Sequence, residues 1–366
     1  MNPACSRSVS RSFHRSLLCT VVTLGMGSAL TTELHAAGAP TPETPAVQSQ
    51  KSSTRTPLHK AIENGEQEVA LQWIATGKEI NTPDSFGLVP LHFAVIQGSV
   101  PLVEALIQKG ADVNARDQRG DTALHMIAAN HGSAELASLL LKRGAKPDFK
   151  NRTGQTPLHW IASDGDLELA RRMIAARADL NIQDETGDTP LQWAAEAGHD
   201  KMVALMVEHG ANPNLANHLG RTPMFWAARS GDIPMAEYLF AMKAKVDVRS
   251  TAGDTPLHWA AGEGHAAMVK FLIRWASDIN PTAEYLETPL HWAAMRGQED
   301  VTGILLAHGA NMEAKDKTGN TALTLAKQKG HEAVVRLLAA RENSLKTVRN
   351  GGNSLRVAAN DPSRRP

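Results

Sequence analysis

Apolar positions recur at helical spacing in short, paired blocks along the chain. In one block Leu257, Ala260 and Ala261 fall at i, i+3 and i+4, which predicts one apolar stripe on a short helix. Gly264 interrupts this stripe, and a second stripe follows on a predicted helix from His265 to about Trp275. Two such helices can close face to face as an antiparallel pair, so each block predicts a helix-turn-helix unit.

A phrase of the form Thr-Pro-Leu-His opens each block and returns every 33 residues, with one step of 34. Thr before Pro favours a helix start, because the hydroxyl can cap free amides and Pro loses no hydrogen bond there. A fixed period of this length predicts nine small units that bury their apolar faces against one another. The phrase begins at Thr56, Val89, Thr122, Thr156, Thr189, Thr222, Thr255, Thr288 and Thr321.

A glycine follows each phrase nine residues after its first position, or ten in the third unit. Asp, Asn and Gly are frequent between units and suit tight turns, which predicts a hairpin-like loop there. The run Gly110-Ala-Asp-Val-Asn114 is repeated in shorter forms further along the chain. The glycines behind the phrases are Gly65, Gly98, Gly132, Gly165, Gly198, Gly231, Gly264, Gly297 and Gly330.

Together these motifs resemble the ankyrin repeat over residues 56 to about 340. The resemblance implies an all-α repeat solenoid of helix-turn-helix units joined by hairpin-like loops, with the first and last of nine repeats as caps. We expect a signal peptide at 1–36, a disordered linker at 37–55, the repeat array at 56–340 and a polar flexible tail at 341–366.

Some repeats lack the expected glycines. Arg177, Lys243 and Ala276 replace the glycine that ends the second helix, and Leu286 replaces the turn glycine in the tip Glu284-Tyr285-Leu286. The third repeat gains one residue near Asn130 and His131. We expect the local backbone geometry to deviate at these sites.

The N-terminus has the order of an export signal. Arginines precede an apolar run from Leu17 to Leu30, and small residues follow up to Ala39. We expect cleavage between about Ala37 and Pro40 and a protein that is secreted, periplasmic or held in the cell envelope. A mitochondrial presequence and an uncleaved anchor remain open alternatives, although about 14 apolar residues are short for a bilayer span.

Charge and cysteine content narrow the classes of partner. The 366 residues hold 38 basic and 38 acidic side chains, and this neutral balance gives no footprint for nucleic acid. Cys5 and Cys19 both lie in the segment that cleavage would remove. No other segment could cross a membrane, and we expect a monomer that binds a protein.

The sequence predicts no catalytic residue, cofactor or metal site. Equivalent histidines lie about one helix spacing apart, roughly 10 Å, whereas zinc ligands lie ~2.1 Å from their ion. We expect these histidines to bond turn backbone and Thr hydroxyls. No nucleophile elbow occurs, and we expect Asp164 and Asp166 to be solvated turn acids of the inter-helix loop rather than an acid/base dyad. The histidines are His59, His92, His125, His159, His258 and His291.

Five consecutive repeats place a tryptophan four residues after their first position. At about 100° per residue this position points about 160 to 200° away from the Leu/Ala stripe of the first helix. The rings could pack between repeats or could form the floor of a recognition groove, and both readings stay open. The tryptophans are Trp160, Trp193, Trp226, Trp259 and Trp292.

The ankyrin resemblance implies binding of a macromolecule through loop tips and inner helices. We therefore expect a non-enzymatic protein-binding scaffold. A secreted effector or inhibitor that captures a foreign protein is the first alternative, and an enzyme with a dispersed site is the second. The candidate contact residues are Phe86, His218, Leu219, Tyr285 and Leu286 at tips, with Trp160, Trp193, Trp226, Trp259 and Trp292 on inner helices.

Overall fold

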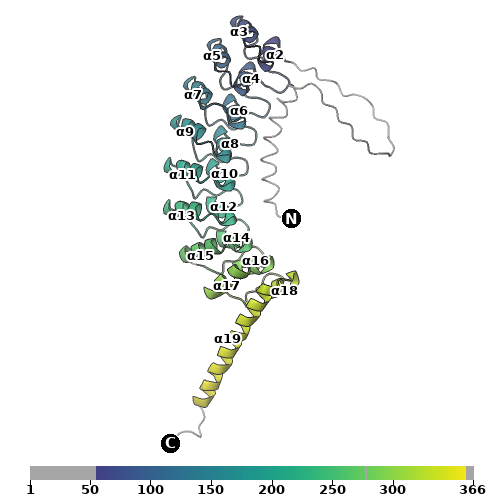
Figure 1. The fold of residues 1–366 in the computed structure, drawn as a ribbon, viewed down its shortest axis with the longest axis vertical. Coiled ribbons are helices and arrows are strands. Elements are labelled where there is room, and N and C mark those ends of the chain that lie inside the picture. The colour runs from purple at the N-terminus through teal and green to yellow at the C-terminus, as the bar shows by residue number, and fades with distance from the viewer. Residues whose placement is uncertain (1–54, 277, 360–366) are drawn as a thin grey trace, which may run out of the picture. The chain divides into compact units, whose positions relative to one another are not determined.

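The computed structural model describes residues 55–276 and 278–359. These residues form nine helix pairs without a strand, which confirms the all-α repeat solenoid (Figure 1). The first helices of the pairs are α2 (Pro57–Glu63), α4 (Pro90–Ile96), α6 (Ala123–Ala129), α8 (Pro157–Asp164), α10 (Pro190–Ala197), α12 (Pro223–Ser230), α14 (Pro256–Glu263), α16 (Pro289–Arg296) and α18 (Ala322–Lys329). The second helices are α3 (Gln67–Ala75), α5 (Val100–Gln108), α7 (Ala134–Lys142), α9 (Leu167–Ala175), α11 (Asp200–Glu208), α13 (Ile233–Ala241), α15 (Ala266–Trp275), α17 (Glu299–Ala307) and α19 (Glu332–Ala359). The predicted signal peptide and all but Arg55 of the linker lie outside the described residues.

The contacts divide the chain into two units, one that runs to Ile161 and includes Asp166–Asp184, and one that holds Ala162–Gly165 and continues from Glu185. In the second unit, successive first helices from α10 to α18 contact one another in one row, and successive second helices from α11 to α19 form another (Figure 1). In the first unit α2, α4 and α6 make the corresponding row.

The apolar stripes predicted from the sequence form the interior of each pair. Leu257, Ala260 and Ala261 of α14 are buried, as are Val269 and Leu272 of α15. The alanines allow α14 and α15 to approach closely. Burying each large aliphatic side chain contributes about 1.5–3 kcal/mol, so packing within and between the pairs stabilises the array.

The threonine that opens the phrase starts several of the first helices through a reciprocal cap. Thr56 is extended (φ −72°, ψ 166°), and Pro57 takes the first helical position of α2. The backbone N–H of Thr56 donates to Nδ1 of His59 at 3.2 Å, while the Thr56 hydroxyl oxygen accepts from the backbone N–H of His59. The same cap forms on α6, α14 and α16, and on α10 with Gln192 in the histidine position.

Three of the expected deviations do not occur. Arg177, Lys243 and Leu286 adopt φ values of 60°, 66° and 60°, the left-handed conformation that glycine takes in the other repeats. The flanking helices and loops therefore impose the turn, and these side chains bear a backbone strain of about 1–2 kcal/mol each. Ala276 does deviate: it is extended (φ −91°, ψ 142°) at the end of α15.

The third repeat places its extra residue differently from the glycine pattern. His131 occupies the position nine residues after Thr122 and takes the left-handed conformation (φ 48°). Gly132 is the residue gained. A Cβ at Gly132 would lie 3.2 Å from the Cα of Ile127. The backbone around Ile127 therefore leaves little room for a side chain at position 132.

In the part of the predicted tail 341–366 that the structure describes, the chain is helical, because α19 continues through residue 340 to Ala359. Glu342 stands 33 residues after Gly309, the glycine that follows α17, so the usual stop signal is missing. Lys346 pairs with Glu342 at 2.5 Å, one turn apart, and supports the extension.

Loops between repeats are hairpin-like, as predicted, and successive loops are joined by backbone hydrogen bonds. Asp117 N–H donates to the carbonyl of Asp121 within one loop at 3.0 Å. Gln118 N–H donates to the carbonyl of Phe86 in the preceding loop at 2.9 Å. The tips are therefore held in register with one another within each unit.

Candidate protein-binding surface

The repeated histidines bond the turn backbone and Thr hydroxyls, which confirms their predicted structural role. His125 is fully buried. Its Nδ1 accepts from the Thr122 N–H at 3.1 Å, so the proton lies on Nε2, which donates to the Gln155 carbonyl at 3.1 Å. Burial lowers the pKa of His125 to about 4 and keeps the ring neutral.

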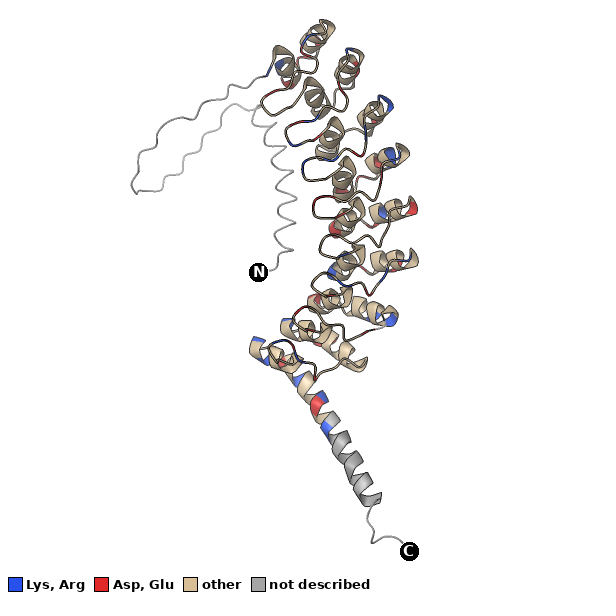
Figure 2. Cartoon of the chain, turned by 180° about the vertical axis from the view of Figure 1, so that it is seen from behind, with Lys and Arg blue, Asp and Glu red and all other residues tan. Residues whose placement is uncertain are grey.

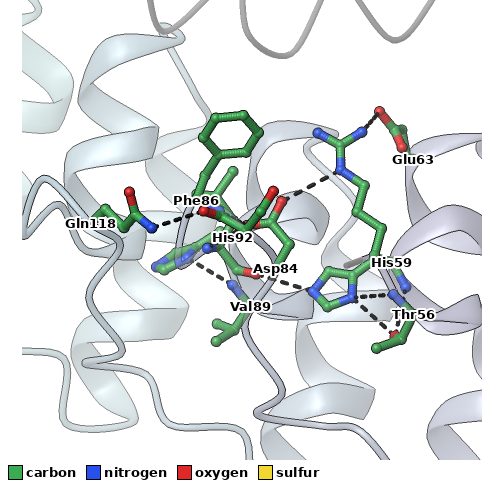
Figure 3. Close-up of polar contacts among 11 residues, drawn as sticks. Thr56, His59, Glu63, Asp84, Phe86, Val89, His92 and Gln118 are labelled. Carbon is green, nitrogen blue, oxygen red and sulfur yellow. Dashed lines mark hydrogen bonds and ion pairs between the residues drawn. The ribbon is translucent and has the colours of Figure 1, made fainter. Parts of the chain in front are cut away.

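Figure 3 shows the same arrangement at the first two repeats. His59 Nε2 donates to the Leu88 carbonyl at 3.1 Å, and His92 Nδ1 accepts from the Val89 N–H at 3.2 Å. The Phe86 ring takes no part in these polar contacts and points away from them (Figure 3). Phe86 is 47% exposed, so this predicted tip residue is open to a partner.

The predicted tryptophans lie mostly between repeats. Trp160, Trp193, Trp226 and Trp259 are buried, and Trp292 is half-buried. Trp226 and Trp259 meet edge to face with ring centroids 6.5 Å apart, and Trp259 and Trp292 follow at 6.4 Å. This geometry favours the packing reading over an open aromatic floor.

Two of the buried indoles have an acceptor five residues earlier in the chain. Trp160 Nε1 donates to Oε1 of Gln155 at 2.7 Å, and Trp259 Nε1 donates to Oδ2 of Asp254 at 2.5 Å. Trp160 also meets His125 edge to face at 5.3 Å. These bonds fix the ring orientations, so the tryptophans contribute to the fold at these repeats.

The tip at His218 and Leu219 is partly used by the loop contacts. His218 is exposed, and its N–H donates to the Thr186 carbonyl at 3.0 Å. Leu219 is half-buried, and its carbonyl accepts from the Thr251 N–H at 2.9 Å. Of these two residues, His218 therefore has the side chain that is more accessible to a partner protein.

The tip at Tyr285 and Leu286 is the most exposed apolar pair among the predicted residues. Tyr285 is 57% exposed and Leu286 is 47% exposed. Lys317 Nζ lies 5.1 Å from the centre of the Tyr285 ring, a cation–π contact that braces one side of the ring. Large apolar side chains held in this way can serve as anchors for a partner.

The same tip lacks the side-chain acceptor that holds the next loop. There, Asp316 Oδ1 accepts from the N–H groups of Thr318 and Asn320 at 2.9 and 2.8 Å. Ala283 occupies the equivalent position and has no oxygen in its side chain. The Tyr285 N–H donates instead to Oε2 of Glu287 at 3.1 Å. The tip therefore keeps its turn without the carboxylate that holds the next loop, and Leu286 has a strained backbone conformation.

A family model described as Ankyrin repeats (3 copies) matches residues 28–117, 91–184, 124–217, 158–250, 213–284, 240–316 and 278–350, which together cover most of the chain. The chain belongs to the ankyrin repeat family. Ankyrin repeats form protein–protein interaction scaffolds, and the family is generally non-catalytic. A comparison with curated proteins found no match.

Sequence reasoning missed an apolar cluster on the second helices of these ankyrin repeats. Phe240 lies 4.7 Å from Trp275 and 6.0 Å from Phe271 between ring centroids. Trp275 is 45% exposed and Met242 is 41% exposed. Trp275 and Met242 occupy the same position in successive ankyrin repeats, 33 residues apart. Other repeats of this chain have His209 or His308 there, so an apolar residue at this position is the sequence feature that could have predicted the cluster.

Within residues 55–276 and 278–359 of this ankyrin repeat protein, no group of three or more His, Cys, Asp or Glu side chains is placed to hold a metal ion. In the same part of the chain, no helix combines the length and apolar character that a membrane span requires. Burial and the neighbouring Asp121 raise the pKa of Asp117 to about 6. Its Oδ1 accepts from the backbone N–H groups of Arg119 and Asp121, so this carboxylate holds the loop together.

Proposed function

We propose that this ankyrin repeat protein is a non-catalytic scaffold that is exported to the cell envelope or secreted and there binds a partner protein. Loop tips and first helices supply the contacts, and the chain acts as a monomer. The observation that carries the binding proposal is the tip Glu284-Tyr285-Leu286, which exposes two large apolar side chains on a strained turn.

Strain at this tip supports recognition rather than stability. A glycine at position 286 would adopt φ 60° without penalty, as Gly319 adopts 82° in the next loop. An aspartate at position 283 would add the side-chain acceptor that Asp316 provides. Backbone strain is often retained in proteins where a surface serves binding. Here the strained Leu286 and the missing side-chain acceptor at Ala283 occur in the same tip as the exposed tyrosine and leucine.

The export part of the proposal is supported by the order of basic, apolar and small residues in 1–36. N-terminal sequencing of the native protein tests it. A first residue between Ala37 and Pro40 is the expected result, and an intact Met1 in soluble cytoplasmic material would contradict export.

The binding part is tested with the full chain immobilised and exposed to envelope and medium fractions of the source. A captured protein is purified, and hydrogen exchange is compared between the free chain and the complex. We expect added protection at residues 284–286, and none at the control segment around Met242, which also exposes a large apolar residue. Capture of no protein, or protection confined to the control segment, would overturn the proposal.

A further inference from the structure

The aromatic cluster on α13 and α15 is exposed although its rings are held by one another. The Phe240 ring of α13 lies 4.7 Å from the Trp275 ring and 6.0 Å from the Phe271 ring, both on α15, between centroids. These contacts cover only part of the Trp275 ring, which is 45% exposed. An exposed indole that its neighbours already orient loses little freedom when it enters a second apolar medium.

Met242 and Trp275 lie at the ends of successive second helices. Met242 is the C-cap of α13, and Trp275 is the last residue of α15. The two helices are neighbours in the second row, and equivalent positions in neighbouring repeats lie about one helix spacing apart, roughly 10 Å (Figure 1). Two large, exposed apolar side chains therefore occupy one edge of this row.

Basic side chains accompany these apolar residues. Two lysines follow Met242 in the loop after α13, and α15 carries a lysine and an arginine one turn apart (Figure 2). The guanidinium carbon of Arg274 lies 5.0 Å from the centre of the Trp275 ring. All four basic side chains are exposed, and within the described residues none of them forms an ion pair. They are Lys243, Lys245, Lys270 and Arg274.

Acidic residues are fewer at this edge. Residues 237–247 and 266–275 hold the four basic groups against Glu237 and Asp247, so the net charge of these two segments is +2. Beyond α15, Asp278 pairs with Arg249 at 3.5 Å, which compensates its charge. The whole chain has equal numbers of basic and acidic residues, so the positive charge is a local feature of this edge.

We propose that this surface, the α13–α15 edge, docks on an anionic lipid surface. Its residues are Phe240, Met242, Phe271 and Trp275 with the four basic side chains. Tryptophan and other large apolar side chains enter the boundary between headgroups and acyl chains, while Lys and Arg remain among anionic headgroups. Docking of this kind is peripheral and reversible, and it goes beyond the proposed function because it requires no protein partner.

The basic residues of the edge suit lipid headgroups better than an acidic protein segment. Carboxylates in proteins are matched best by the paired N–H groups of Arg, and Lys is depleted at protein–protein interfaces. At the α13–α15 edge three of the four basic residues are Lys, a point charge on a flexible stem. Such charges can follow headgroups that move within a bilayer.

The test is co-sedimentation of the full chain with vesicles of phosphatidylglycerol and phosphatidylcholine in equal parts, and with vesicles of phosphatidylcholine alone. We expect binding to the anionic vesicles to be at least about tenfold stronger, because only these attract the basic side chains. No binding to either vesicle, or equal binding to both, would overturn the proposal. Residues 1–54 are common to all variants, so a difference between variants reports on the repeats.

A double change in charge locates the contact. Lys270→Gln with Arg274→Gln should weaken binding to anionic vesicles about thirtyfold, since each basic residue near the surface contributes about fivefold. The matched control is Lys142→Gln with Arg143→Gln, two exposed residues at the end of α7, where Lys142 has the repeat position of Arg274. The control should bind nearly as the wild type does. Equal losses in the two double variants would overturn the proposal.

Two changes at Trp275 separate anchoring from folding. All seven tryptophans of the chain lie within the described residues, and Trp275 is the one whose side chain is exposed. Lipids brominated in the acyl chain should quench its fluorescence in the wild type. Trp275→Phe should abolish the quenching but keep vesicle binding and the melting temperature, whereas Trp275→Ser should weaken binding about tenfold. Quenching that persists in Trp275→Phe would overturn the proposal.

Two other occupants of the edge would give different results. An acidic protein segment is indicated if an oligoglutamate peptide binds the wild type but not the Lys270→Gln, Arg274→Gln variant, while anionic vesicles do not bind. A second copy of the chain is indicated if sedimentation velocity without vesicles shows a dimer that Trp275→Ser dissociates. Either result would overturn lipid docking. The vesicle experiments contain no partner protein, so their failure leaves the proposed function intact.

Discussion

Nε2 of His125 donates to the backbone carbonyl of Gln155 at 3.1 Å, and this bond ties one ankyrin repeat to the next. The same ring accepts from the Thr122 N–H, so one buried side chain closes its own helix cap and the following loop. In the fifth repeat Gln192 performs both tasks: its Oε1 accepts from the Thr189 N–H at 2.8 Å, and its Nε2 donates to the Arg221 carbonyl at 2.7 Å.

Replacement of His125 tests this link. His125→Gln should lower the free energy of unfolding by less than about 1 kcal/mol, because glutamine can keep both bonds. His125→Ala leaves a cavity and two unpaired backbone groups and should cost about 3 kcal/mol. Urea denaturation of both variants provides the comparison, and equal losses would show that the two bonds contribute little.

Stability should fall in acid. Burial lowers the pKa of His92, His125 and His258 to about 4, whereas the unfolded value is 6.5. Between these values the unfolded chain binds more protons, so the free energy of unfolding is full above about pH 6.5 and decreases as pH falls towards 4. Asp117, with its raised pKa of about 6, acts in the opposite direction but is one group against several histidines.

Denaturant titrations at a series of pH values from neutral to 4 measure this slope. His258→Gln, which copies the residue found at Gln192, should reduce the slope while it leaves neutral-pH stability nearly unchanged. A chain that is as stable at pH 4.5 as at pH 7.5 would show that the histidines are not held neutral.

Two turn glycines should differ in their tolerance of alanine. Both Gly187 (φ 78°) and Gly198 (φ 75°) have left-handed backbone, which costs about 1–2 kcal/mol for any other residue. A Cβ at Gly198 meets open space, but one at Gly187 would lie 2.6 Å from the backbone nitrogen of His218. Gly187→Ala should therefore cost about 1–3 kcal/mol more than Gly198→Ala, and equal melting temperatures would contradict this.

The sequence predicted the helix pairs, their caps and the role of the histidines, because these depend on local chemistry repeated at a fixed period. It did not predict that Arg177 and Lys243 would keep a left-handed turn, since the neighbouring repeats impose that conformation from outside the local sequence. The continuation of α19 was also not predicted, because polar composition is typical of a tail, whereas the missing stop at Glu342 lets the helix continue.

The candidate site was less predictable than the fold. Exposure of Tyr285 and Leu286 follows from their place in a tip, but burial of Trp226 and Trp259 depends on the rings of adjacent repeats. The stacking of Arg221 on Trp259 joins the loop before α12 to α14, 38 positions further along the chain, and no local pattern signals it.

Capture of a protein partner by the Tyr285–Leu286 tip is tested by the double change Tyr285→Ser with Leu286→Gly. Partner titration and calorimetric unfolding are measured side by side, with Met242→Ser as the control for loss of an exposed apolar side chain. We predict that affinity falls at least about tenfold while the melting temperature is unchanged or rises, because glycine relieves the strain at position 286. Unchanged affinity would remove the tip from the binding site, and a large fall in melting temperature would show that Tyr285 and Leu286 are needed for folding.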